Sequence, residues 1–136
     1  NLKIRIPQWI DGRISLKING KEMSAQWKNG EWGEVMKTWN DGDIVEIQFP
    51  MNLKFSSVDP RHQTVAALCY GPVVLAANQP GPFRGNSEDP SLWIQRSSND
   101  ELVFEIKHPE QSFQFKPYYA YQEGEKYYLY NIITKG

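Results

Sequence analysis

The sequence has little with which to form covalent cross-links or to attract polyanions. Cys69 is the one cysteine among 136 residues, so the chain cannot form an internal disulfide. Fifteen basic and sixteen acidic residues give a net charge of -1, which creates no positive field for nucleic acid or an anionic membrane surface. The composition therefore predicts no nucleic-acid partner and no membrane partner.

Long apolar runs are missing as well. Residues 62–83 carry no formal charge apart from His62, but Gly71, Pro72 and Gln-Pro-Gly-Pro at 79–82 interrupt them. Because no window of about 20 apolar residues exists, we expect a soluble chain without a membrane span. The first residues show no initiating Met and no signal-peptide pattern. We therefore expect an isolated domain fragment of a longer polypeptide, with any targeting signal upstream.

Catalytic and metal-binding motifs are also missing. His62 and His108 lie far apart, and neither belongs to a His-x-His or Cys-x-x-Cys spacing of the kind that metal sites use. No Gly-x-Ser-x-Gly motif occurs, and Cys69 has no basic neighbour to activate its thiol. A glycosidase pair of carboxylates stays open, although the spacing of the sixteen acids nominates no two of them. We predict no catalytic residue, no metal site, no cofactor and a structural role for Cys69.

The sequence does contain a clear alternation of apolar and polar residues with a period of two. This alternation occupies residues 2–6, 14–18 and 45–55 and is typical of antiparallel strands with one solvated face. Asn-Gly pairs at 19–20 and 29–30 predict tight turns. No window shows a sustained period of 3.6 residues, so we expect almost no helix.

A third turn is predicted at residues 40–43, Asn-Asp-Gly-Asp. Asp41 and Asp43 lie two residues apart there and could contact Ca²⁺. However, Asn, Asp and Gly in such a run are first of all turn residues, so the structural interpretation is much the stronger one.

The second half of the chain differs from the first. Residues 64–77 are apolar at both parities of the alternation, which predicts a central strand covered on both faces. Gly71 then permits a bulge or a close approach of another chain segment, and Pro72 lies where no ladder donor is needed. Residues 78–100 are expected to form a long loop, and strands resume over 101–133. We predict a single all-β domain over residues 1–136, an antiparallel β-sandwich of jelly-roll-like or immunoglobulin-like type.

Aromatic side chains provide the candidate binding residues. Trp9, Trp27, Trp32 and Trp93 lie in or near predicted turns, and exposed rings on a β-sandwich suit stacking against sugars. The alternative interpretation is that each Trp fills the core or a domain interface. The tyrosine-rich run at 118–130 fits a surface covered by a neighbouring domain as well as it fits a ligand.

Four motifs occur in an order that resembles a known family. They are IPQW at 6–9, KINGK at 17–21, TWNDGDIVEIQFPM at 38–51 and ALCYGPVVLA at 67–76. This order is similar to the β-sandwich region that follows the catalytic barrel in glycoside hydrolase family 127, the β-L-arabinofuranosidases and related enzymes. Residues 115–130 resemble the tyrosine pattern that closes many of these proteins. Glu34 and Lys37 depart from the family, which often has an aromatic residue and an arginine at these places.

The resemblance implies an upstream (α/α)₆ barrel that carries an acid/base glutamate and a zinc-bound cysteine nucleophile. None of those motifs occurs here, and Cys69 matches no position of that catalytic set. We therefore expect a non-catalytic accessory domain of a glycoside hydrolase acting on arabinofuranoside-type plant glycans, packed against the catalytic domain of the same polypeptide.

Two alternative functions stay open at this stage. One is a carbohydrate-binding module that uses the four tryptophans, with carbohydrate as its partner. The other is a protein-interaction or dimerisation domain in which the tyrosine-rich C-terminal strands form an edge for another chain. If the family sandwich borrows a strand from the N-terminus of its polypeptide, the fragment lacks that strand and exposes an apolar edge, so we also expect some self-association.

Overall fold

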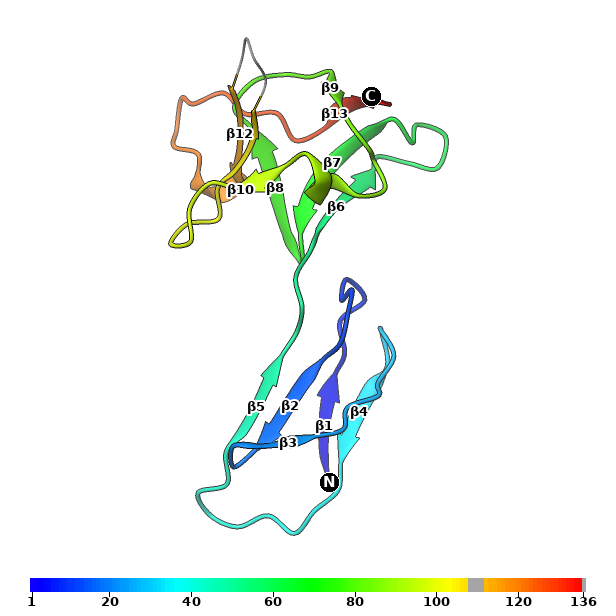
Figure 1. The fold of residues 1–136 in the computed structure, drawn as a ribbon, viewed down its shortest axis with the longest axis vertical. Coiled ribbons are helices and arrows are strands. Elements are labelled where there is room, and N and C mark those ends of the chain that lie inside the picture. Colours follow the sequence, from blue (N-terminus) through cyan, green and yellow to red (C-terminus); the bar gives the residue numbers. More distant parts are fainter. Residues whose placement is uncertain (108–111, 136) are drawn as a thin grey trace. The chain divides into compact units, whose positions relative to one another are not determined.

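The computed structural model describes residues 1–107 and 112–135, and every count below refers to these residues. His108, which entered the metal-site prediction, lies outside them. The described chain divides into two compact units, Asn1–Met51 and Asn52–Gly136 (Figure 1). The interpretation of residues 1–136 as one domain stays a prediction, and each unit is described by itself.

The first unit contains two small antiparallel sheets (Figure 1). One pairs β1 (Leu2–Arg5) with β4 (Trp32–Val35), and the other has the order β3 (Lys21–Met23), β2 (Ser15–Ile18), β5 (Val45–Gln48). The alternation predicted for residues 14–18 sets which side chains of β2 are buried, since Leu16 and Ile18 meet Val35 of β4 in one apolar cluster. The inner faces of the two sheets therefore pack together as a small sandwich.

The predicted turn at Asn19-Gly20 is confirmed. Ile18 pairs with Lys21, and the two residues between them have φ of 52° and 78°. Positive φ at both central positions is the geometry of the hairpin turn that Asn-Gly favours. This turn fixes the register of β2 with β3.

The second unit is built on one sheet with the strand order β10-β11-β12-β8-β7-β13-β9, and β6 pairs with β7. Its strands are β6 (Leu53–Ser57), β7 (Val65–Tyr70), β8 (Val73–Ala77), β9 (Phe83–Arg84), β10 (Gln95–Arg96), β11 (Phe104–Lys107), β12 (Ser112–Pro117) and β13 (Asn131–Thr134). Two 3₁₀ turns, η1 (Pro90–Leu92) and η2 (Tyr118–Ala120), complete the described elements. The pairs are antiparallel except for β13 with β9, so the predicted all-β, antiparallel fold class is confirmed.

The prediction of one central strand over residues 64–77 is wrong. These residues form the hairpin β7–β8, in which Tyr70 pairs with Val73 around Gly71 and Pro72 (Figure 1). Gly71 has a φ of +54°, the conformation that the first central position of a two-residue turn requires. Pro72 follows at a position where the hairpin needs no N–H donor from it.

The predicted burial of both faces in this stretch is confirmed. Ala66, Ala67 and Leu68 are buried in succession on β7, and Leu75 to Ala77 are buried in succession on β8. Both strands have a partner on each side, because β6 and β8 flank β7 while β7 and β12 flank β8. Successive residues of a strand point to opposite faces of the sheet, so burial in succession shows that both faces of these inner strands are covered and explains why the alternation of a half-exposed strand is absent.

The predicted long loop at 78–100 contains regular elements, namely β9, η1 and β10. Phe83 and Ile94 from this region are each 2 % exposed and belong to the main core of the unit, together with Phe104 and Phe115. The region is therefore a structured part of the core, because its apolar side chains are spaced to reach inward from short elements. Among the described residues no helix is long and apolar enough to cross a membrane.

Candidate functional site

Of the four tryptophans predicted to bind sugar, Trp9 and Trp32 lie in contrasting surroundings. Trp9 is half-buried against the cluster of Ile6 and Ile10, with its ring edge-to-face to Phe49 at 6.3 Å. Trp32 is 61 % exposed on β4, opposite Arg5 of β1. Trp9 therefore has a packing function, whereas Trp32 is available to solvent.

Trp93 belongs to the second unit and is held by several contacts. Its ring stacks on Phe55 with 5.9 Å between centroids, and its indole N–H donates to the carbonyl oxygen of Asn86 over 2.9 Å. A Cβ atom on Gly85 would lie 2.1 Å from this ring, so the indole rests directly on the backbone there. These contacts match the structural interpretation of Trp93 more closely than an open platform.

Trp27 combines packing with access to a pocket. It packs against both aliphatic clusters of the first unit, and a Cβ atom on Gly33 of β4 would lie 2.3 Å from its ring. Trp27 also lines a pocket of about 480 Å³ together with Arg13, Ser24 and Gln26. Of the four tryptophans predicted to bind sugar, Trp27 is thus the one that lines this pocket together with polar residues.

The polar residues of this pocket were not predicted from the sequence. Arg13 precedes β2 and Gln26 follows β3, so neither lies in a motif. The signal was nevertheless present in the hairpin at Asn19-Gly20, whose register pairs Leu16 with Met23. Continuing that register by three residues places Arg13 opposite Gln26, in agreement with their common pocket.

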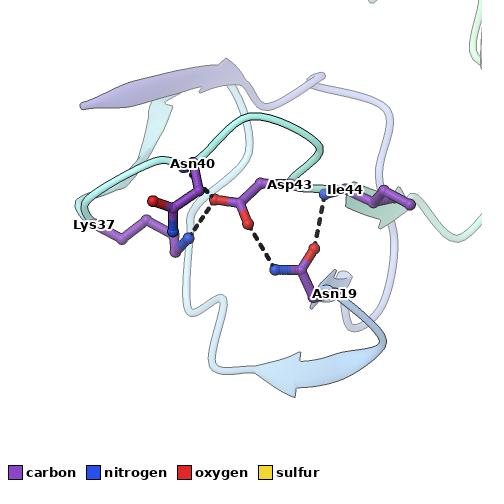
Figure 2. A network of polar contacts seen from close by, with 5 residues as sticks. All are labelled: Asn19, Lys37, Asn40, Asp43 and Ile44. Carbon is purple, nitrogen blue, oxygen red and sulfur yellow. Dashed lines mark hydrogen bonds and ion pairs between the residues drawn. The ribbon is translucent and has the colours of Figure 1, made fainter.

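The predicted turn at residues 40–43 is organised around the carboxylate of Asp43 (Figure 2). Its Oδ2 accepts hydrogen bonds from the Asn40 backbone N–H (2.9 Å) and from Lys37 Nζ (2.6 Å). Its Oδ1 accepts from Asn19 Nδ2 (2.8 Å), while Asn19 Oδ1 accepts from the Ile44 N–H (2.8 Å). These donors, the Asn40 N–H first, hold the pKa of Asp43 well below its usual range.

This network supports the structural interpretation of the turn over a Ca²⁺ site. Both oxygens of Asp43 accept from protein donors, including the Lys37 ammonium, which also lies 4.8 Å from the centre of the Trp39 ring. Within the described ranges, no group of three or more His, Cys, Asp or Glu could hold a metal ion. Asp43 joins the turn to the β2–β3 hairpin as a structural element.

Cys69 lies on β7 between Lys54 of β6 and Val74 of β8. It is half-buried, and this burial raises the pKa of its thiol. A raised pKa keeps the sulfur protonated at neutral pH and makes it a poor nucleophile. This environment supports the predicted structural role.

A group of exposed tyrosines follows β12. We call these residues the tyrosine surface: Tyr118, Tyr119, Tyr127 and Tyr130, which are 49 %, 65 %, 46 % and 56 % exposed. Tyr118 and Tyr119 are edge-to-face at 5.6 Å, and Tyr127 lies 5.2 Å from the ring of Tyr121.

Tyr121 anchors this segment to the sheet. Its hydroxyl donates to the Ala76 carbonyl oxygen over 2.9 Å, and Lys116 Nζ lies 4.3 Å from its ring centre and 3.5 Å from Glu125. Burial, followed by the nearby charge of Glu125, raises the pKa of Tyr121 to about 12. The segment that carries the exposed tyrosines is therefore attached to β8 through the Tyr121 hydroxyl.

Comparisons with solved structures define the class of this fold. A structure described as a glycoside hydrolase aligns with a TM-score of 0.70 and 19 % identity over 97 % of this chain and 27 % of its own length. A GH127 β-L-arabinofuranosidase from Geobacillus stearothermophilus T6 aligns with a TM-score of 0.64, 22 % identity and coverages of 97 % and 26 %. A GH127 β-arabinofuranosidase aligns with a TM-score of 0.60 and 15 % identity over 90 % of this chain and 23 % of its own length. The fold is thus that of a β-rich region of glycoside hydrolases, and the chain spans about a quarter of these structures.

The family itself is indicated by the first unit. Residues 1–51 match the family model described as the middle domain of GH127 β-L-arabinofuranosidases, which confirms the resemblance predicted from the motifs. No curated protein matches the sequence. The family match ends at Met51, where the first structural unit also ends.

Proposed function

We propose that residues 1–136 are a non-catalytic accessory region of a glycoside hydrolase that acts on arabinofuranoside-type plant glycans. The observation that carries this proposal is the match of the whole first unit to the GH127 middle domain. The solved structures of similar fold are about four times as long as this chain. The proposal assigns catalysis to the upstream domain of the same polypeptide that the family resemblance implies.

The ionisation of the carboxylates supports a non-catalytic function. A glycosidase needs one carboxyl group with a raised pKa as general acid. Among the described acids whose pKa departs clearly from its usual value, the direction is downward in each case: Glu34, Asp43, Asp59 and Glu125. Each accepts hydrogen bonds that favour the charged form, as Asp59 does from His62 Nδ1 over 2.7 Å.

The tyrosine surface supports packing against the rest of the polypeptide. Tyrosine combines a large apolar ring with a polar hydroxyl, and it is enriched at protein interfaces. Four such rings are exposed within residues 118–130, and one of them, Tyr127, lies against the anchored Tyr121. About three quarters of the length of the matching structures lies outside the aligned region, so a partner surface of sufficient size is expected in the parent protein.

An activity assay tests the non-catalytic assignment. Residues 1–136 should not hydrolyse a chromogenic β-L-arabinofuranoside, because none of the four described carboxyl groups with a clearly shifted pKa is shifted upward, as a general acid requires, and burial raises the pKa of the Cys69 thiol. The parent protein is the positive control. Turnover by the purified fragment at a rate comparable with the parent would overturn the proposal.

Substitution in the parent protein tests the packing assignment. Tyr119→Ser with Tyr127→Ser should lower the thermal unfolding midpoint of the parent by several degrees, since two interface rings are lost, and should lower the midpoint of the fragment less, because only the ring contacts with Tyr118 and Tyr121 are lost there. Exposed Glu123→Ser in the same segment is the matched control. Equal midpoints of the double variant and the parent would exclude this surface as the docking face.

The same variant addresses self-association of the fragment. With the catalytic domain absent, the tyrosine surface has no partner, so we expect light scattering to detect oligomers in concentrated solution. Tyr119→Ser with Tyr127→Ser should reduce them. A strictly monomeric fragment would count against both self-association and a dimerisation function.

A further inference from the structure

The pocket beside Trp27 has no part in the proposed docking function, yet it has the composition of a ligand site. It is lined by Trp27, by Gly12, Ile14 and Ala25, and by three residues with polar side chains, Arg13, Ser24 and Gln26. Its volume of about 480 Å³ falls in the range of about 300–1,000 Å³ that is usual for small-molecule sites. We propose that this pocket binds a neutral carbohydrate, with a sugar ring against Trp27.

The rigidity of Trp27 favours this assignment. One part of the indole rests over Gly33, where a side chain would collide with it, and the residue also packs against both aliphatic clusters. A ring fixed in this way loses little conformational freedom when a ligand stacks on it. Glycine at position 33 is the feature that allows the indole to lie so close to β4.

The polar lining suits hydroxyl groups. The Ser24 hydroxyl and the Gln26 amide can each donate and accept, and the Arg13 guanidinium donates. These three residues lie at the open end of the β2–β3 hairpin, Arg13 before β2 and Ser24 and Gln26 after β3, and all three line the one hollow. A polyhydroxylated ring with one apolar face uses both kinds of surface at once.

The charges around the pocket favour a neutral ligand over an anion. Arg13 is its one charged lining residue, and the Glu22 carboxylate lies 3.9 Å from the Arg13 guanidinium. An anion entering beside Arg13 therefore meets a negative charge that partly neutralises the attraction. No carboxylate, imidazole or thiol lines the pocket, so its residues indicate binding and not hydrolysis.

The test is a titration of ¹⁵N-labelled residues 1–136 with neutral oligosaccharides of arabinose, xylose and glucose, and separately with glucuronic acid. The five tryptophans each give an indole N–H signal, and we expect one neutral oligosaccharide to shift the Trp27 signal saturably while the Trp93 signal stays in place. Absence of any saturable shift at Trp27 would overturn the proposal. Preferential binding of glucuronic acid would replace the neutral ligand with an anion and would also overturn it.

Variants separate binding from folding. Trp27→Ala should abolish the binding, but it also removes core packing, so the decisive variants are Arg13→Ala and Gln26→Ala at exposed positions. Each should weaken binding about fivefold or more, the equivalent of one lost hydrogen bond. Lys28→Ala, next to the pocket but not part of its lining, is the matched control. Equal affinity of Arg13→Ala, Gln26→Ala and Lys28→Ala for the shifting sugar would overturn the site.

Discussion

The two units of this chain bury their apolar side chains in different ways. The second unit has one continuous core in which Phe83 contacts both Phe113 and Phe115, with ring centroids 4.9 and 5.4 Å apart. The first unit has two separate clusters of three buried aliphatic residues each. It adds half-buried tryptophans over these clusters and a polar network around Asp43.

This difference follows from size. A unit of 51 residues buries a smaller fraction of its surface than a larger one and gains less from hydrophobic burial. Hydrogen-bonded turns and large rings that cover a small core then contribute a greater share of the stability. The comparison teaches that the first unit should be sensitive to changes in its turns and ring contacts, and the second to changes in its aromatic core.

The largest expected effect is the loss of the central aromatic residue of the second unit. Phe115 is 1 % exposed, and Phe115→Ala should cost about 3–5 kcal/mol of unfolding free energy, because it removes the ring and leaves a cavity. Urea unfolding followed by the amide signals of residues 65–77 measures the change. Val58→Ala, at a position 46 % exposed, should stay within about 0.5 kcal/mol. A similar small cost for Phe115→Ala would remove the basis for the contrast between the units.

A single methyl group should test the ring-over-backbone packing of the first unit. Gly33→Ala places a Cβ atom 2.3 Å from the Trp27 indole, so the ring must move out of both clusters, and we expect a loss of about 1–3 kcal/mol. The indole signal of Trp27 should shift strongly. Glu31→Ala, at an exposed position of the adjoining turn, serves as control. Unchanged stability in Gly33→Ala would show that Trp27 does not close this small core.

The second unit also contains a buried polar side chain, the amide of Asn131. Its Oδ1 accepts from the Gly81 N–H (3.2 Å), and its Nδ2 donates to the Tyr128 carbonyl oxygen (3.1 Å). Asn131→Ala leaves both backbone groups without this partner, which should cost about 1–3 kcal/mol. The exposed Asn99→Ala is the control, and chemical denaturation is the measurement. A loss as large as that of Phe115→Ala would mean that hydrogen bonds dominate both units.

The sequence predicted the strands of the first unit better than those of the second, for a physical reason. The strands and turns of the first unit follow from local sequence patterns. The alternation around Leu16 and Ile18 predicts a strand, and Asn19-Gly20 predicts the turn that follows it. In the second unit, the pattern predicts one strand through Gly71 and Pro72, because the apolar residues on both sides hide the point where one central strand ends and the next begins. Phe83 and Ile94 looked like loop residues, since only long-range packing shows that they enter the core.

The same distinction holds for the candidate site. Trp27 could be nominated from its residue type and its place near a turn, but Arg13, Ser24 and Gln26 carry no motif. They come together through the register of the β2–β3 hairpin. This register can be predicted only if the turn is first placed at Asn19-Gly20. Trp9 and Trp93 had the same signal as Trp27, and their packing on Phe49 and Phe55 depends on contacts that are distant in sequence.

The smallest expected effect concerns the polar network of the first unit and depends on pH. The pKa of Asp43 is lower in the folded chain than its ordinary value of about 3.9, so its carboxylate stabilises the fold above that value and the contribution is lost as the pH falls toward the lowered pKa. Asp43→Asn should therefore lower the unfolding midpoint at pH 7, and its difference from the unmodified chain should shrink steadily below pH 4. Asp41→Asn, in the same turn, is the control for a change of net charge. A difference that stays constant from pH 7 to pH 2.5 would show that the Asp43 charge, with its partner Lys37, contributes nothing to the stability of the first unit.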